Sequence, residues 1–241
     1  MFPEIKKELQ KSANPEKAKK LQRFFKTGKG EYGEGDIFLG IIVPKQREIV
    51  KNYYKTTTLA DIKKLLQSKI HEYRLTALLF LVAKYNNGNE PEKKQIASLY
   101  LINTKWVNNW DLVDLSAPNI LGAYFLDKQK KIIYKLAESK NLWERRIAIL
   151  ATFVFIKNNN YEDSLKIAEI LLNDRHDLIQ KATGWMLREI GKRNIKVELS
   201  FLNKYYKIMP RTMLHYAIER FQPEERRRFL NKGRRVKSDL L

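Results

Sequence analysis

Three phrases decide the fold class, because they share one order of residue types: HEYRLTALLF (71–80), LWERRIAILA (142–151) and LIQKATGWML (178–187). In each, a basic residue is followed after two positions by a small residue and then by an apolar pair. The small residues are Ala77, Ala148 and Gly184, and the second lies 71 positions after the first and 36 before the third. A helix pair that recurs every ~35 to 45 residues is typical of HEAT-like α-solenoids. A plain helical bundle is the alternative, but small residues at one slot favour stacked helices.

Apolar residues recur at helical spacing through most of the chain. The clearest stretches are RLTALLFLVAKY (74–85), RRIAILATFVFIK (145–157), DSLKIAEILLN (163–173) and IQKATGWMLREIGK (179–192). Short alternating runs between tight turns, which would indicate strands, are nearly absent. The sequence therefore predicts an all-α fold, organised as a single α-solenoid domain over residues 1–241.

Two segments depart from this helical pattern. Residues 27–36 hold four glycines and predict a flexible loop, which lacks the GxxxxGK[ST] pattern of a phosphate-binding loop. The phrase FLGIIVP then leads into a helix, with Pro44 suited to its first turn. The basic C-terminal tail, about residues 223–241, contains ERRRFLNKGRRVKSD. A solvated tail and a phosphate-binding arm are both compatible with that run of charges.

The charge balance gives the first indication of function. There are 47 Lys and Arg residues against 27 Asp and Glu, a net charge of +20. Basic side chains displace condensed counterions from nucleic acids, so this excess favours a nucleic-acid partner. A lysine-rich solvated surface or an acidic membrane surface are the alternatives. The absence of cysteine excludes disulfides, thiol catalysis and cysteine-ligated metals.

Composition also bears on cofactors and location. His71, His176 and His215 are far apart and lack helical ligand spacing, so we expect no metal site, no cofactor and no histidine-based nucleophile. No apolar run approaches the ~18 residues of a membrane span. The N-terminal MFPEIKKELQ is amphipathic and charged, unlike a secretory signal. We expect a soluble, cytoplasmic monomer that does not bind membranes.

The stretch NNWDLVDLSAP (108–118) places Trp110 and Asp114 four residues apart. On a helix they lie one turn apart and point the same way. A structural interpretation makes Trp110 a core residue and Asp114 a cap or an ion-pair partner. The functional interpretation depends on residues of the later repeat phrases.

Arg146 lies in the second repeat phrase and Trp185 in the third. Lys181 and Arg188 flank Trp185 at helical spacing, a basic and aromatic mixture suited to a phosphodiester backbone. Equivalent positions of successive repeats line one face of a solenoid. That face would carry a carboxylate, two indoles and a guanidinium among lysines.

Four phrases in this order resemble the AlkD-like family of DNA alkylation-repair glycosylases: EYGEGDIFLGIIVP (31–44), NNWDLVD (108–114), LWERRIAILATF (142–153) and IQKATGWMLRE (179–189). The resemblance runs from about residue 15 to about residue 222. It implies a right-handed superhelix of HEAT-like helix pairs whose basic concave surface binds duplex DNA. It also implies hydrolysis of the N-glycosidic bond of cationic alkylpurines, typically 3-methyladenine and 7-methylguanine.

The resemblance assigns roles to individual residues. Asp114 is the expected catalytic carboxylate, Trp110 and Trp185 are aromatic walls of the site, and Arg146 binds the DNA backbone. Phe24 departs from the pattern, because some relatives have a tyrosine there, so a hydroxyl contact to DNA is in doubt.

A carboxylate suits this chemistry because loss of a cationic base leaves positive charge on the deoxyribose. With a reference pKa near ~3.9, Asp114 is expected to be ionised at neutral pH. No lysine is marked out as a Schiff-base nucleophile, so the sequence predicts a monofunctional hydrolase, associated with the nucleoid when bound to DNA. A non-catalytic HEAT-like module that binds nucleic acid or acidic proteins is the competing interpretation.

Overall fold

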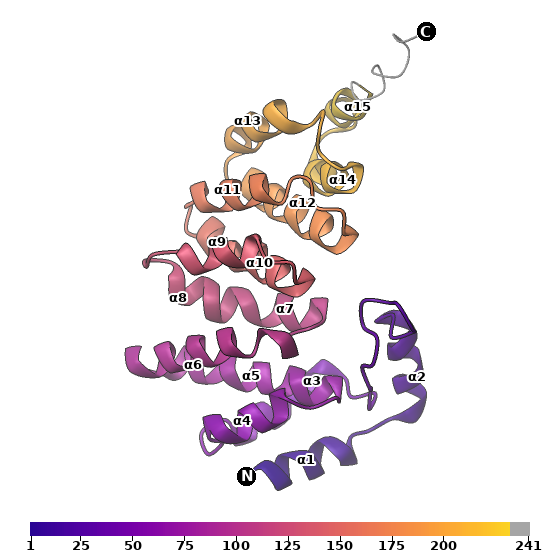
Figure 1. The fold of residues 1–241 in the computed structure, drawn as a ribbon, viewed down its shortest axis with the longest axis vertical. Coiled ribbons are helices and arrows are strands. Elements are labelled where there is room, and N and C mark those ends of the chain that lie inside the picture. The colour runs from indigo at the N-terminus through magenta and orange to yellow at the C-terminus, as the bar shows by residue number, and fades with distance from the viewer. Residues whose placement is uncertain (232–241) are drawn as a thin grey trace. The chain divides into compact units, whose positions relative to one another are not determined.

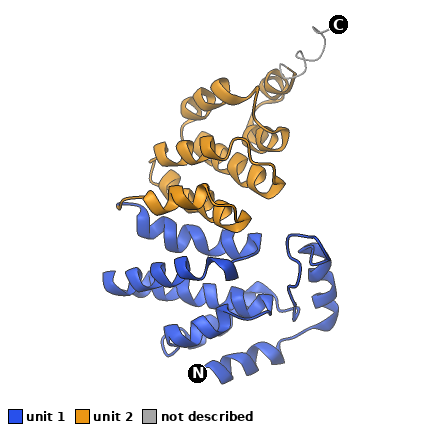
Figure 2. Cartoon of the chain, in the orientation of Figure 1, with its two compact units in different colours: residues 1–127 blue, residues 128–241 orange. Residues whose placement is uncertain are grey.

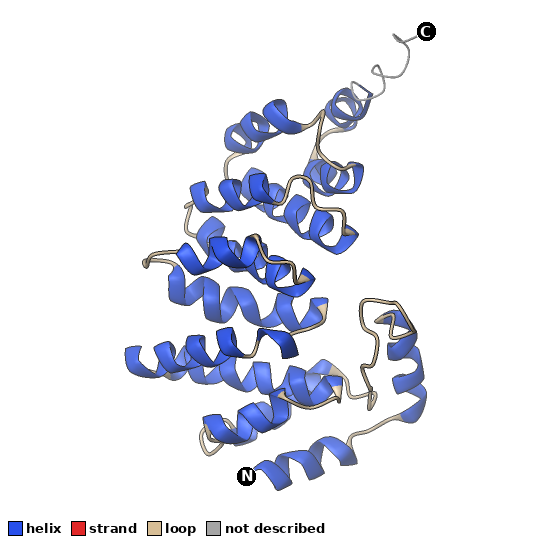
Figure 3. Ribbon diagram, viewed as in Figure 1, coloured by secondary structure: helices blue, strands red, loops and turns tan. Residues whose placement is uncertain are grey.

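The computed structural model of the protein describes residues 1–231, which form helices, turns and loops (Figures 1 and 3). The only β-type pairing in this range is a single parallel bridge between Ile37 and Ile70. The prediction of an all-α fold is confirmed for these residues. They group into two compact units, Met1–Asp127 and Lys128–Leu241, the second described as far as Asn231 (Figure 2).

The helices of the first unit surround α5. Their bounds are α1 Phe2–Lys11, α2 Pro15–Phe24, α3 Val43–Tyr53, α4 Leu59–Leu66, α5 His71–Asn87, α6 Glu90–Ile102, η1 Thr104–Trp106, α7 Trp110–Ala117, η2 Pro118–Gly122 and α8 Ala123–Phe125. Helix α5 packs against α3, α4, α6 and α7. Every side chain from His71 to Leu81 is buried, which a helix reaches only when neighbours cover all its faces. Pro44 lies in the first turn of α3, as the sequence predicts.

The second unit is arranged around α10 and α12. Its elements are α9 Lys131–Ala137, α10 Leu142–Lys157, α11 Glu162–Ile170, α12 Asp177–Gly191, α13 Ile195–Tyr205, α14 Arg211–Ala217, η3 Ile218–Arg220 and α15 Pro223–Asn231. Helix α12 packs against α10, α13 and α14. The first part of the expected basic tail is thus helical, and residues 232–241 lie outside the described residues.

Asparagine side chains define where many of these helices begin. An N-cap side chain accepts a hydrogen bond from one of the backbone N–H groups that the first turn leaves unpaired. The asparagines that do so are Asn14, Asn89, Asn109, Asn141 and Asn194, before α2, α6, α7, α10 and α13. Local hydrogen bonds of this kind fix the register at which each helix presents its side chains.

The three repeat phrases lie in α5, α10 and α12, and their small residues Ala77, Ala148 and Gly184 are all buried. At Gly184 the reason is explicit. A Cβ atom placed there would lie 2.3 Å from the carbonyl oxygen of Met213 and 2.6 Å from Cβ of Tyr216. Helix α14 therefore approaches the backbone of α12 at a distance that only glycine permits. The close packing predicted for this slot is confirmed at Gly184, and a right-handed superhelical arrangement of the repeats stays a prediction.

We expect Gly184→Ala to lower the free energy of unfolding by about 1–3 kcal/mol, because the added methyl group meets backbone atoms that cannot move independently. An ordinary helical Gly→Ala change would act in the opposite direction by up to about 1 kcal/mol. Urea unfolding followed by circular dichroism measures the difference. Lys135→Ala, at an exposed position of α9, is the matched control and should stay within about 0.5 kcal/mol of the parent. A stabilised Gly184→Ala variant would contradict the close approach.

Candidate active site

Helix α7 carries both Trp110 and Asp114. Asn109, fully buried, caps the helix by accepting a hydrogen bond from the backbone N–H of Trp110 at 2.8 Å. Because α7 is helical throughout Trp110–Ala117, the two side chains lie one turn apart, as their spacing predicts. Both are partly exposed. One face of α7 therefore presents an indole and a carboxylate together.

Two phenylalanines at the end of α2 hold the indole of Trp110. The ring of Phe25 stacks on it with centroids 5.1 Å apart and planes 22° apart. The ring of Phe24 meets it edge-on at 5.8 Å and is 63% exposed. The position that departs from the family pattern thus lies beside Trp110, and it offers an apolar ring to any ligand in place of a hydroxyl group.

The helix changes its geometry one turn after Asp114. Pro118 stands four residues further on and has no N–H to donate to the carbonyl oxygen of Asp114. The chain continues as a π-helical turn, η2, a geometry frequent at functional sites. The carboxylate also acts on a buried neighbour. Burial raises the pKa of Tyr100, and the charge of Asp114 raises it further against the opposing effect of a hydrogen bond to Ser116.

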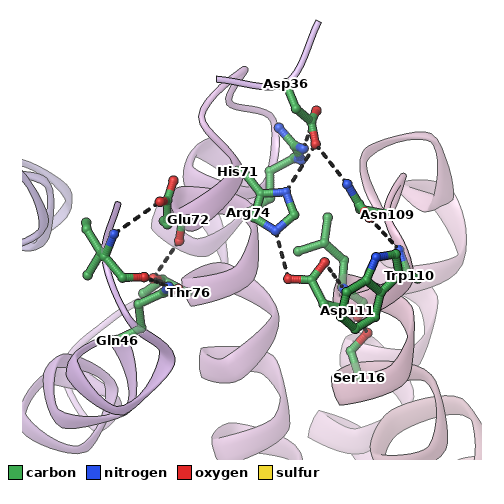
Figure 4. Close-up of polar contacts among 12 residues, drawn as sticks. Asp36, Gln46, His71, Glu72, Arg74, Thr76, Asn109, Trp110, Asp111 and Ser116 are labelled. Atoms are coloured by element: carbon green, nitrogen blue, oxygen red, sulfur yellow. Dashed lines mark hydrogen bonds and ion pairs between the residues drawn. The ribbon is translucent and has the colours of Figure 1, made fainter. Parts of the chain in front are cut away.

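The buried side of α7 is anchored by a cluster of four titratable side chains, which we call the His71 cluster: Asp36, His71, Arg74 and Asp111 (Figure 4). The Nδ1 atom of His71 lies 3.1 Å from Asp36 Oδ2, and its Nε2 atom lies 2.8 Å from Asp111 Oδ2. Arg74 donates to the other oxygen of Asp36 at 2.6 Å. The cluster joins the loop before α3, the first turn of α5 and the first turn of α7.

The charges of the cluster raise the pKa of His71 and lower the pKa of Asp36. Burial alone would lower the pKa of His71, but the charge of Asp111 and hydrogen bonds to Asp111 and Asp36 outweigh burial and raise it. Burial alone would raise the pKa of Asp36, but the hydrogen bond from His71 and the charge of Arg74 outweigh burial and lower it. Each shift favours the charged form. The members of the cluster therefore support one another's ionisation.

Glu72, next to His71, fixes the chain that follows the glycine-rich segment. Its carboxylate accepts hydrogen bonds from the backbone N–H groups of Leu39, Gly40 and Ile41, the shortest being 2.7 Å at Gly40. Gly40 has a φ of +82°, and a Cβ atom there would lie 2.1 Å from the carbonyl oxygen of Asn14. A glycine and a buried acid thus bring the loop against both α5 and the start of α2.

We expect Glu72→Gln to cost about 2 kcal/mol of unfolding free energy, because the amide keeps one acceptor oxygen and turns an NH₂ group toward backbone donors. Hydrogen exchange should accelerate at the amides of Gly40 and Ile41 and stay unchanged in the second unit. Glu16→Gln, at an exposed position of α2, is the control. Unchanged protection at Gly40 and Ile41 would show that Glu72 does not hold the loop.

The second unit brings together Lys181, Trp185 and Arg188 on α12. The Trp185 indole donates to Glu189 at 3.1 Å and packs against Phe153, and it is partly exposed. Lys181 forms an ion pair with Asp177 one turn earlier. Arg188 pairs with Glu219, and its charge opposes the burial that raises the pKa of Glu198 to about 8. Of the two cations, Lys181 is the more accessible, since the Arg188 side chain is only 16% exposed.

Arg146 lies deeper than its expected role in binding the DNA backbone suggests. It is 5% exposed, and its Nη1 atom donates to the carbonyl oxygen of Leu178 at 2.6 Å. Leu178 belongs to the first turn of α12, so Arg146 ties α10 to α12.

The other two histidines differ from His71. Burial lowers the pKa of His176 and of His215, although neighbouring aspartates partly oppose the shift at His176. Within residues 1–231, no group of three or more acidic and histidine side chains has the arrangement of a metal site. In the His71 cluster the two ring nitrogens point to different carboxylates and so do not converge on one ion. No helix in the described range is both long and apolar enough to cross a bilayer.

Sequence reasoning missed the His71 cluster and Glu72. Their partners are far apart in the chain, with 35 positions between Asp36 and His71 and 40 between His71 and Asp111. A signal was present, however, because the first turn of α5 places His71, Glu72 and Arg74 at the start of an otherwise apolar helix. Three charged or titratable residues that a helix buries at one end must find partners there.

Comparison with known protein families identifies one family for this chain. Residues 5–221 match the family model described as DNA alkylation repair enzyme. A solved structure described as a predicted DNA alkylation repair enzyme from Enterococcus faecalis is similar with a TM-score of 0.69 and 18% identity, over 88% of this chain and 98% of that one. AlkD2 from Streptococcus mutans is similar with a TM-score of 0.54 and 17% identity, over 85% and 97% of the two chains. No curated protein matches the sequence significantly. At these identities the two structures show a shared fold.

Proposed function

Because the chain belongs to the DNA alkylation repair enzyme family, we propose that it is a monofunctional glycosylase that releases cationic alkylpurines from duplex DNA. The observation that carries the proposal is the partly exposed face of α7, where Trp110 and Asp114 lie one turn apart beside the exposed ring of Phe24. Family membership supports a role in DNA repair, and the Asp114 carboxylate supports hydrolysis of the glycosidic bond as the reaction.

The reaction needs little beyond a fixed negative charge. Alkylation at N3 or N7 makes the purine a cation, so the base departs neutral when the bond to C1′ breaks, and its bonding electrons leave with it. Positive charge then develops on the deoxyribose, where the Asp114 carboxylate stabilises it. Water adds its oxygen to C1′ and releases one proton, and the same carboxylate orients that water. The indole of Trp110 offers an apolar wall that also favours a nearby cation.

The distribution of positive charge supports DNA as the partner. Helix α2, which ends at Phe24, buries none of its residues. Four of its side chains are basic: Lys17, Lys19, Lys20 and Arg23. A solvated helix of this composition, next to Trp110, suits contact with phosphates, which position a protein without reading the base sequence.

The second unit has proposed DNA contacts of its own. Trp185 offers a partly exposed indole, and Lys181 offers an ammonium group whose exposed ion pair with Asp177 a phosphate can replace at small cost. We assign Arg146 and Arg188 to the same set, with Arg146 also fixing the first turn of α12. A non-catalytic HEAT-like binding module would use the same basic groups without needing Asp114.

We expect Asp114→Asn to reduce base release on the order of 10²-fold or more while DNA binding is kept, because a full charge is removed next to a cationic transition state. Single-turnover release of 7-methylguanine, measured beside a binding titration, tests this. Asp127→Asn, at an exposed carboxylate of the same unit, is the control and should release the base at the parental rate. Parental release by Asp114→Asn would remove the carboxylate from the mechanism.

We also expect uracil and hypoxanthine to be poor substrates, because these neutral bases need a proton donor to leave. The histidine of the first unit cannot serve, since His71 is 1% exposed and both of its nitrogens face carboxylates. Matched duplexes that contain 7-methylguanine, hypoxanthine or uracil compare the three rates directly. Similar rates on all three would reveal a general acid. No release from any of them would favour the binding module.

A further inference from the structure

The geometry of the His71 cluster determines the protonation state of its histidine. A neutral imidazole has one N–H and one lone pair, so one of its nitrogens would turn a lone pair toward a carboxylate oxygen. At 3.1 Å from Asp36 and 2.8 Å from Asp111, both nitrogens of His71 lie at donor distance from such oxygens. Only the imidazolium donates to both. The side chains of His71 and Asp36 are 2% and 4% exposed, so no water replaces these partners.

Three segments of the chain contribute the charged groups around His71. The loop before α3 contributes Asp36, α5 contributes Arg74 and α7 contributes Asp111. Two aromatic rings, themselves stacked on each other, pack against the imidazole, with Phe38 stacked at 4.4 Å and 20° and Phe25 tilted at 5.1 Å. With His71 charged, two cations face two anions and the cluster is neutral. With His71 uncharged, a net negative charge is buried, which is costly.

We propose that the His71 imidazolium is a positioning group for the active site: it holds Asp111, and through Asp111 the first turn of α7, so that Trp110 and Asp114 keep their places. Asp111 has one oxygen toward His71 and the other toward the backbone N–H of Leu112, which donates at 2.8 Å. A proton on His71 is therefore linked, through one carboxylate, to the backbone of the helix that carries the candidate site. The reaction that this positioning serves is the one proposed above, whereas the link itself exists without DNA.

The sign of the pH dependence follows from the raised pKa of His71. A group whose folded-state pKa exceeds its unfolded value, near ~6.5 for histidine, stabilises the fold fully below the unfolded value. That stabilisation is lost as the pH rises through the raised folded value. The proposed reaction itself gives no reason for the rate to fall at alkaline pH, because Asp114 acts as a carboxylate and the cationic base needs no proton donor. Loss of positioning at alkaline pH is thus specific to His71.

Nuclear magnetic resonance of the full-length protein without DNA provides the primary test. The chain has three histidines, and the pKa values of His176 and His215 are lowered, so at pH 7 the His71 ring should be the protonated one. We expect both of its ¹⁵N nuclei at imidazolium shifts, assigned by their loss in His71→Gln. The indole N–H signal of Trp110 is assigned among four tryptophans by its loss in Trp110→Phe. In a pH titration its chemical shift should change with a midpoint at the pKa of His71. A neutral His71 at pH 7, or a Trp110 signal that does not follow its titration, would overturn the inference.

The Asp111→Asn variant adds the kinetic readout. It keeps one acceptor oxygen and removes one charge, so the pKa of His71 should fall by about one unit or more. Relative to the parent, single-turnover base release should be reduced at every pH, because the amide oxygen accepts from only one of the two donors, and should fall by up to about a further tenfold per pH unit between the two pKa values of His71. Taking the ratio of rates at each pH cancels any titration of the lesion. A ratio that is constant with pH would indicate a merely structural role.

Asp127→Asn is again the control, because it removes an exposed charge of the same unit and should leave both His71 and the rate ratio unchanged. The two proposals fail separately. A parent protein that releases no base but whose Trp110 signal follows His71 would refute the glycosylase and keep the positioning link. An active parent whose Trp110 signal ignores His71 would do the reverse.

Discussion

The hydrogen bonds from His71 to Asp36 and Asp111 determine where the candidate active site lies. They join a loop, the start of α5 and the start of α7, three segments that share no sequence proximity. Transferring such charges from water into a protein costs several kcal/mol per ion, and pairing recovers that cost only when the geometry is good. The cluster is therefore better understood as a device that fixes position than as a source of stability. An apolar cluster of equal size would pack these segments together with less directional control.

Two neighbouring carboxylates of α7 differ in burial and in partners. Asp111 is buried against the His71 cluster, whereas Asp114, three residues later, is partly exposed beside Trp110. Residues three apart are neighbours on a helix, so the group that anchors α7 lies directly beside the carboxylate of the candidate site. The π-turn that begins at Pro118 follows directly, so the segment with the candidate chemistry lies between a cap at Asn109 and a local change of helix geometry.

The sequence predicted the parts of this arrangement that depend on local periodicity. Helical spacing identified the helices, the slot of Gly184 indicated close packing against a neighbour, and the spacing of Trp110 and Asp114 placed them on one face. It did not predict the pairing of His71 with carboxylates 35 and 40 residues away, because no local rule encodes such distances. The burial of Arg146 could not be predicted from the sequence for a related reason. Its bond to the Leu178 carbonyl depends on how α12 packs against α10.

Charge has two roles in this protein, one long-range and one local. The net positive charge attracts polyanions, and individual buried charges hold α7 in place. The net charge of +20, and the solvated basic helix α2, act over a Debye length of about 8 Å or more and attract polyanions without orienting them. A carboxylate that is to stabilise a cation must instead be held in place to a fraction of an ångström. Because two cations and two anions cancel within the His71 cluster, α7 is fixed without adding net charge behind Asp114. The basic surface proposed to attract DNA can thereby carry the one carboxylate that the proposed reaction needs.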